Sequence, residues 1–150
     1  MSAPRSTSAP ETVDPLRSIP FLIVSRRPDT PGNLQSRIIR FETVAMENPI
    51  GSSLSNRHVW ADVEHAPDGI CADDEGAVWV ASVPGAHCVR VSQGGEVLDE
   101  VAVDRGCFAC MLGGDDGCTL YIVANHYSNS GASDGNVLVQ PVAVPHAGRP

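Results

Sequence analysis

DDEGAVWVA (residues 73–81) organises the chain, because residues 115–124 repeat it as DDGCTLYIVA. Both stretches place an acidic turn before an apolar strand that ends in alanine. Their aromatic residues, Trp79 and Tyr121, are 42 positions apart. Repeats of about 40 to 50 residues with four short strands each are typical of β-propeller blades.

Short apolar runs separated by Gly-rich or Asp-rich turns continue through the chain beyond residue 36. A second repeat links three of them: RIIRF at 37–41, HCVRV at 87–91 and NVLV at 136–139. Apolar residues nowhere keep helical spacing there, so a parallel sheet with crossover helices is disfavoured and neighbouring strands are expected to pair as antiparallel hairpins. The predicted strands cover residues 37–44, 57–63, 69–72, 77–82, 88–92, 96–103, 108–112, 119–124 and 136–144.

The fold prediction is all-β: a partial β-propeller of about two to three antiparallel four-stranded blades in residues 37–150. Closed propellers use about four to eight blades, so these residues do not close a ring by themselves. Because each blade buries its faces against its neighbours, we expect self-association or aggregation. Residues 1–36 hold six of the twelve prolines and are predicted to be irregular or disordered.

Charge and hydropathy exclude several partners. The chain of 150 residues carries 10 basic residues, all arginine, against 18 acidic residues, for a net charge of −8. Without a basic cluster, neither nucleic acid nor an anionic membrane surface is an expected partner. The apolar run at residues 19–24 is interrupted by Pro20 and is far shorter than the roughly 20 residues of a membrane-spanning helix. The first 16 residues lack the apolar region of a secretory signal, so a cytoplasmic protein is predicted.

APDGICADDEGAVWVA at residues 66–81 resembles the PDG-containing blade of the senescence marker protein, gluconolactonase and regucalcin-like family. Further stretches match the family in its order, namely residues 89–92, 95–97, 110–114, 119–123 and 144–150. The resemblance covers about residues 37–150. It implies the C-terminal part of a six-bladed parent propeller.

The resemblance implies a metal-dependent lactone hydrolase, which acts on a small lactone or ester and holds a divalent cation, with calcium as first choice, on the propeller axis. Asp68 matches the Asp of the family's PDG motif, one of the cation's ligands. An Asp between Pro and Gly at the entry to an inner strand suits this role, because its carboxylate can face the central channel. A cation there would polarise a lactone carbonyl and acidify a bound water. Asp68 is therefore the candidate metal-binding and catalytic residue.

The family's other ligands, an acidic residue of the first blade and an Asn of a middle blade, have no counterpart in this sequence. Calcium takes about six to eight oxygen ligands, so we expect the isolated chain to be inactive or very weakly active unless other blades or another chain complete the site. The alternative is a noncatalytic β-repeat interaction module that uses its exposed blade faces. Asn125 and His126 follow a strand that is expected to end near the channel mouth, and they are the candidate pocket residues.

The five cysteines form an odd set without a secretion signal, so reduced thiols are expected. Cys107 and Cys110 have CxxC spacing, but the second pair that a zinc site needs is missing. In a regular strand these two side chains would face opposite sides. Burial as small core residues is the favoured interpretation, and metal binding or redox chemistry is the alternative.

The acidic residues at 73–75 and 115–116 lack the alternating ligand spacing of a calcium loop and precede strands. They are predicted to form solvated hairpin turns. Trp60 and Trp79 fall within predicted strands and are expected to pack between blades.

Overall fold

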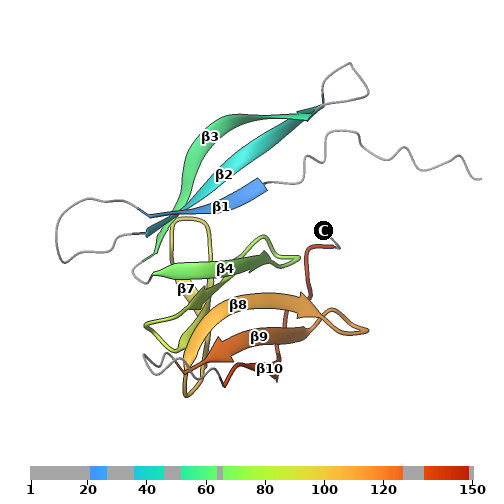
Figure 1. Ribbon diagram of the computed structural model, residues 1–150. Coiled ribbons are helices and arrows are strands. Elements are labelled where there is room, and N and C mark those ends of the chain that lie inside the picture. Colours follow the sequence, from blue (N-terminus) through green and yellow to red (C-terminus); the bar gives the residue numbers. More distant parts are fainter. Residues whose placement is uncertain (1–20, 27–35, 46–51, 64–65, 127–133, 149–150) are drawn as a thin grey trace, which may run out of the picture.

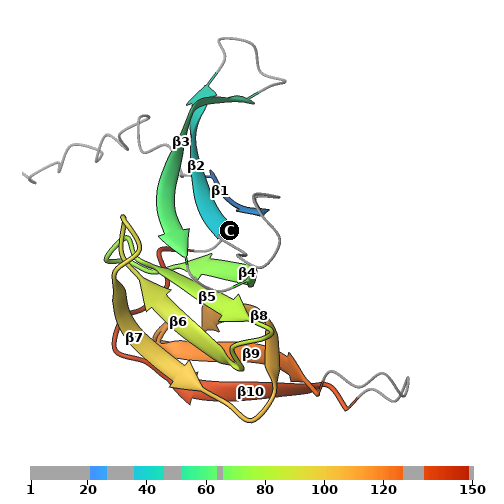
Figure 2. The same cartoon turned by 90° about the vertical axis from the view of Figure 1, so that its left-hand side faces the viewer.

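The structure is a computed structural model that describes residues 21–26, 36–45, 52–63, 66–126 and 134–148. The regular secondary structure of these residues consists of β-strands, which form three antiparallel sheets (Figure 1, Figure 2). The all-β prediction is therefore confirmed. Nowhere in these ranges is there a helix with the length and apolar character needed to cross a membrane.

The central sheet is a four-stranded meander in the order β4-β5-β6-β7. Its strands are β4 (Pro67–Ala72), β5 (Val78–Ser82), β6 (His87–Val91) and β7 (Val97–Ala102). Every side chain of β5 is buried, whereas β7 forms the edge and is mostly exposed. The buried strand is the apolar run of the repeat that organises the sequence.

The sheet that follows has the order β10-β9-β8, with β8 (Gly106–Gly113), β9 (Thr119–Asn125) and β10 (Asn136–Pro141). It repeats the register of the central sheet. Trp79 lies opposite Cys71 in the first copy, and Tyr121 lies opposite Met111 in the second. The sequence repeat is therefore a structural repeat.

The first sheet has the order β1-β2-β3, with β1 (Phe21–Arg26), β2 (Ser36–Ala45) and β3 (Ser52–Val63). Strand β1 corrects the prediction that residues 1–36 are irregular, because Phe21–Arg26 pairs with β2 along its whole length. This short apolar run gains its hydrogen-bond partners from a distant strand, which local composition does not reveal. The rest of residues 1–35 lies outside the described part of the chain.

Two apolar clusters hold the sheets together. One lies between the central sheet and the β8–β10 sheet and is built around Trp79, Leu120 and Ile122. The other joins the first sheet to the central sheet and contains Trp60 and Ile38. Both tryptophans are buried between sheets, as predicted.

The segment after β10 returns to the central sheet. The predicted strand at 136–144 ends at Pro141, and the following residues bridge two turns. The amide of Asp74 donates to the carbonyl of Pro145 over 2.9 Å, and the amide of His146 donates to Gly117 over 3.2 Å. This segment therefore links the β4–β5 turn to the β8–β9 turn.

The acidic turn at residues 73–75 differs from its prediction. Asp73 is buried, with 1% of its surface exposed, and its Oδ2 accepts a hydrogen bond of 2.6 Å from Nε of Arg90 on β6. Its Oδ1 accepts from the backbone amides of Glu75 and Ala77. Glu75 accepts a second hydrogen bond from Arg90, over 2.8 Å. The turn is thus a folded ion-pair cluster and not a fully solvated loop.

Candidate functional site

Asp68 is the second residue of β4, and its side chain is exposed. The register between β4 and β5 shifts here, because Pro67 pairs with Ser82 and Ile70 pairs with Val80. Asp68 and Gly69 therefore oppose one residue of β5 and form a β-bulge. Bulges redirect side chains and recur beside functional sites.

Gly69 is required in this bulge by the approach of β4 to β8. A Cβ atom at this position would lie 2.6 Å from Cα of Ala109, and real Cβ atoms do not come so close to backbone. Strand β8 has a bulge at the same register, around Phe108. Phe108 therefore occupies in the third sheet the position that Asp68 occupies in the central sheet, and the second copy lacks the carboxylate.

Asn125 is the last residue of β9, and His126 follows it. Since Asn125 pairs with Gly106 at the start of β8, and β4 and β8 run in the same direction (Figure 1), both residues lie at the end of the sheets where Asp68 lies. The structure thus places the three residues at one end.

Asp134 joins the candidate pocket residues and was not found from the sequence. Its Oδ2 lies 2.6 Å from Nδ1 of His126, and its Oδ1 accepts from the His126 amide over 3.1 Å. The side-chain oxygen of Asn125 accepts from the Asp134 amide over 3.2 Å. The hydrogen bond from His126 lowers the pKa of Asp134. His126 and Asp134 are eight positions apart in the sequence, so no local sequence pattern predicts this contact.

Arg105 adds a positive charge to this end of the sheets. It forms two hydrogen bonds with its neighbour Asp104, of 2.7 and 2.9 Å, and Nη1 lies 3.9 Å from the Asp134 carboxylate. The hydrogen bonds from Arg105 lower the pKa of Asp104 to about 2. The carboxylates here are therefore charged and paired at neutral pH.

The described residues do not enclose a metal ion by themselves. Among them, no three His, Cys, Asp or Glu side chains are grouped so as to hold one. Asp68 offers a single exposed carboxylate, whereas a calcium ion takes about six to eight oxygen ligands. These residues alone therefore do not fit a calcium ion.

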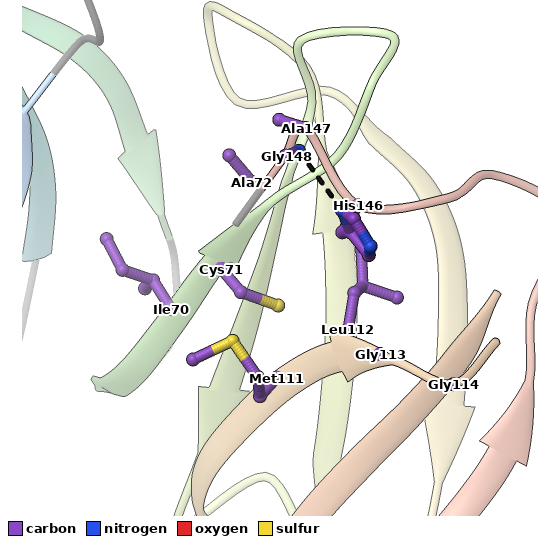
Figure 3. A pocket seen from close by; sticks show the side chains of 10 residues that line it. All are labelled: Ile70, Cys71, Ala72, Met111, Leu112, Gly113, Gly114, His146, Ala147 and Gly148. Carbon is purple, nitrogen blue, oxygen red and sulfur yellow. Dashed lines mark hydrogen bonds between the residues drawn. The ribbon is translucent and has the colours of Figure 1, made fainter. Parts of the chain in front are cut away.

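A pocket of about 500 Å³ lies beside the last residues of β4 and β8 (Figure 3), whereas Asp68 is the second residue of β4. Its walls combine the last residues of β4, those of β8 and the returning segment; among them are Cys71, Met111, Leu112 and His146. Nδ1 of His146 accepts from the amide of Gly148 over 3.1 Å. No candidate site residue from the sequence lines this pocket.

Cys107 and Cys110 face the same side of β8, which corrects the expectation of opposite faces. The bulge at Phe108 adds one residue to the strand and so changes the alternation of side chains. Both thiols are buried, with 0% and 5% of the residues exposed, in the cluster beneath the central sheet. Burial as core residues is therefore confirmed.

Comparison with known proteins identifies the class. The family described as SMP-30/Gluconolactonase/LRE-like region matches residues 35–126, and the chain belongs to this family. Regucalcin from Sus scrofa is 35% identical over 83 residues, which are 53% of this chain and 26% of regucalcin. The 6-deoxy-6-sulfogluconolactonase of Pseudomonas putida is 33% identical over 91 residues, which are 56% of this chain and 31% of that protein.

A solved luciferin-regenerating enzyme has a similar fold. Its TM-score is 0.57 at 22% sequence identity, and the match covers 73% of this chain and 39% of the enzyme. The chain thus matches between about a quarter and two fifths of the length of these proteins. The family resemblance found in the sequence is confirmed.

Proposed function

We propose that this chain contributes part of a lactone-hydrolysing site, with Asp68 as one ligand of a divalent cation, calcium by preference. The observation that carries the proposal is the position of Asp68, exposed in a bulge at the start of β4 in a member of the SMP-30/gluconolactonase family. The other ligands would come from another chain, for which a second copy of this chain is the first candidate. The isolated chain is then expected to be inactive or very weakly active.

The proposed substrate is a small lactone or ester. This class is supported by the name of one relative, a 6-deoxy-6-sulfogluconolactonase. Asn125 and His126 would contact the substrate at the Asp68 end of the sheets, apart from the pocket of about 500 Å³, and Asp134 would orient the imidazole of His126. A neutral His whose Nδ1 donates to a carboxylate keeps Nε2 as an acceptor, which suits it to hold a water or a hydroxyl group. A cytoplasmic location is part of the same proposal.

Calcium titration tests the proposal. Asp68→Asn removes the charge with little change in shape, and we expect it to abolish saturable calcium binding measured by isothermal titration calorimetry on the full chain. Asp115→Asn, in an exposed turn at the other end of the sheets, is the matched control and should leave binding unchanged. Equal binding by wild type and Asp68→Asn would contradict the assignment of Asp68, and so would an absence of binding by the wild type at every oligomeric state.

A second candidate function is a noncatalytic interaction module, and one surface favours it. Met111, Tyr121 and Val139 form one row across β8, β9 and β10, and Val123 and Val137 form the next. These five apolar side chains are between 39% and 64% exposed. Uncovered apolar patches of this kind mark association sites. The proposed occupant is a second copy of this chain.

A further inference from the structure

We propose that Cys71 and Cys110 form a dithiol pair that hydrogen peroxide converts to a disulfide between β4 and β8. The pair is separate from the proposed lactonase site, because neither cysteine is among the residues proposed for that site and Cys71 lines the pocket of about 500 Å³. The inference therefore does not depend on the proposed function.

The two sulfur atoms already face each other between the sheets. They lie 4.0 Å apart, so closure to the roughly 2.05 Å of a disulfide needs a movement of about 2 Å. The backbones approach closely beside both cysteines, since a Cβ at Gly69 would meet Cα of Ala109 at 2.6 Å. This proximity places the pair within reach of a cross-link.

Of the four thiols in or against the cluster between the central sheet and the β8–β10 sheet, only the one of Cys71 is accessible to an oxidant. Cys88, Cys107 and Cys110 are buried, with 0%, 0% and 5% of their surface exposed, whereas Cys71 is partly exposed. Cys71 lines the pocket of about 500 Å³, and its side chain extends from β4 toward β8, where Met111 lies (Figure 3). The pocket gives a small oxidant access to Cys71 first.

The protonation of the pair favours the same order of events. The hydrogen bond with Cys110 lowers the pKa of Cys71 despite its burial. Hydrogen bonds with Cys71 and Cys88, together with burial, raise the pKa of Cys110. A thiolate is the nucleophile, and the pKa of Cys88 is also lowered by a hydrogen bond with Cys110. Because Cys88 is buried and Cys71 lines the pocket, Cys71 is the thiol that reacts first.

The chemistry is balanced as two displacements. The Cys71 thiolate attacks one peroxide oxygen, the O–O bond breaks, and hydroxide leaves as Cys71 becomes a sulfenic acid. The Cys110 sulfur then attacks the Cys71 sulfur, the S–O bond breaks, and the proton of Cys110 leaves with the hydroxyl group as water. Overall, two thiols are oxidised by two electrons, and one peroxide is reduced to two waters.

Mass spectrometry of the full chain tests the proposal. The reduced protein is treated with hydrogen peroxide, its remaining thiols are alkylated, and it is digested without reduction by trypsin and an enzyme that cleaves before aspartate. Cleavage before Asp68, Asp73 and Asp115 separates Cys71 from Cys88, and Cys118 from the CxxC pair. We expect a linked product of residues 68–72 with residues 106–114, and the five free thiols fall by two.

A matched pair of variants identifies the partner cysteine. Cys107→Ala and Cys110→Ala remove thiols from the same strand and the same buried cluster, and only Cys110→Ala should abolish the linked product. Three results on the wild type would overturn the proposal even if a variant does not fold. These are an unchanged thiol count, a disulfide that leaves Cys71 free, and oxidation of Cys71 to sulfinic acid without a cross-link.

Discussion

Arg90 is the side chain on which the turn between β4 and β5 depends. It pairs with Asp73, whose side chain is 0% exposed, and its second nitrogen holds Glu75. Arg90→Met would leave the Asp73 carboxylate buried without its counterion. Breaking a buried pair from one side costs about 3 kcal/mol or more. We expect the free energy of unfolding, measured with urea, to fall by about this amount.

Arg105→Met is the control for this prediction. Arg105 also pairs with a neighbouring carboxylate, but Asp104 is 66% exposed at its side chain. Solvent and salt screen an exposed pair and leave it little net effect on stability, so this variant should unfold close to the wild type. Equal losses in the two variants would mean that burial of Asp73 does not set the strength of its pair.

Single residues also show where sequence reasoning stops. Asp73 and Asp115 begin the same repeat motif, yet the first is buried against Arg90 and the second is exposed. The difference comes from Arg90, which lies on β6 and pairs with Asp73. This contact is not local, so the motif alone predicts the turn but not its ion pair.

Strands were predictable because they depend on local patterns. All nine predicted strands are present with shifted boundaries, since Val, Ile and aromatic residues between Gly-rich or Asp-rich turns favour them. The bulges in β4 and β8 were not predicted. The bulges arise from the pairing of β4 with β5 and of β8 with β9. They determine on which side of its sheet the side chain of Asp68 or Cys107 lies. The direction in which a side chain points on β4 or β8 therefore depends on the strand-pairing register, which the sequence alone does not reveal.

The open face of the β8–β10 sheet leads to a prediction at the level of the element. Tyr121 occupies in the β8–β10 sheet the repeat position that Trp79 occupies in the central sheet. Trp79 is covered by the β8–β10 sheet and is 1% exposed, whereas Tyr121 is 39% exposed. A face that is built like a covered one and left open should associate with a second copy. Val139→Lys places a charge in the apolar row beside Tyr121, so we expect light scattering after size-exclusion chromatography to show a smaller average mass than for the wild type.

Val97→Lys serves as the comparison. Val97 is 56% exposed on edge strand β7, close to the 61% of Val139, and lies outside the apolar rows. It should leave the mass distribution unchanged. If the wild type is a monomer at high concentration, self-association through this face is ruled out.

At the scale of the whole molecule, the three sheets follow one another along the chain and pack face to face through two cores. Family and all-β class were within reach of the sequence, because an ordered set of short motifs carries both. The residues of a complete active site could not be predicted from the sequence, because the family's other metal ligands have no counterpart in this chain. Asp68 as a ligand, with Asn125 and His126 as pocket residues, remains a prediction.

The returning segment joins two sheets, and its removal should loosen both. A chain ended at Val144 loses the carbonyl of Pro145, which accepts from the Asp74 amide, and the amide of His146, which donates to Gly117. We expect hydrogen exchange at the Asp74 amide to accelerate several-fold, because the amide loses its acceptor and such a hydrogen bond contributes about 1 kcal/mol. A chain shortened only by residues 149–150 is the control, and equal exchange in both would show that the link is not needed.

This link also fixes an order of events during synthesis. The ribosome releases the β4–β5 turn first and makes the residues that cover it only after β8, β9 and β10. The central sheet can form from neighbouring hairpins at once, whereas its closing contact spans a long stretch of chain and forms late. A nascent chain stalled within β9 would therefore present an open Asp74 amide and an unfinished pocket. The last contact made is therefore the one that ties the two turns together, across sheets that already share an apolar cluster.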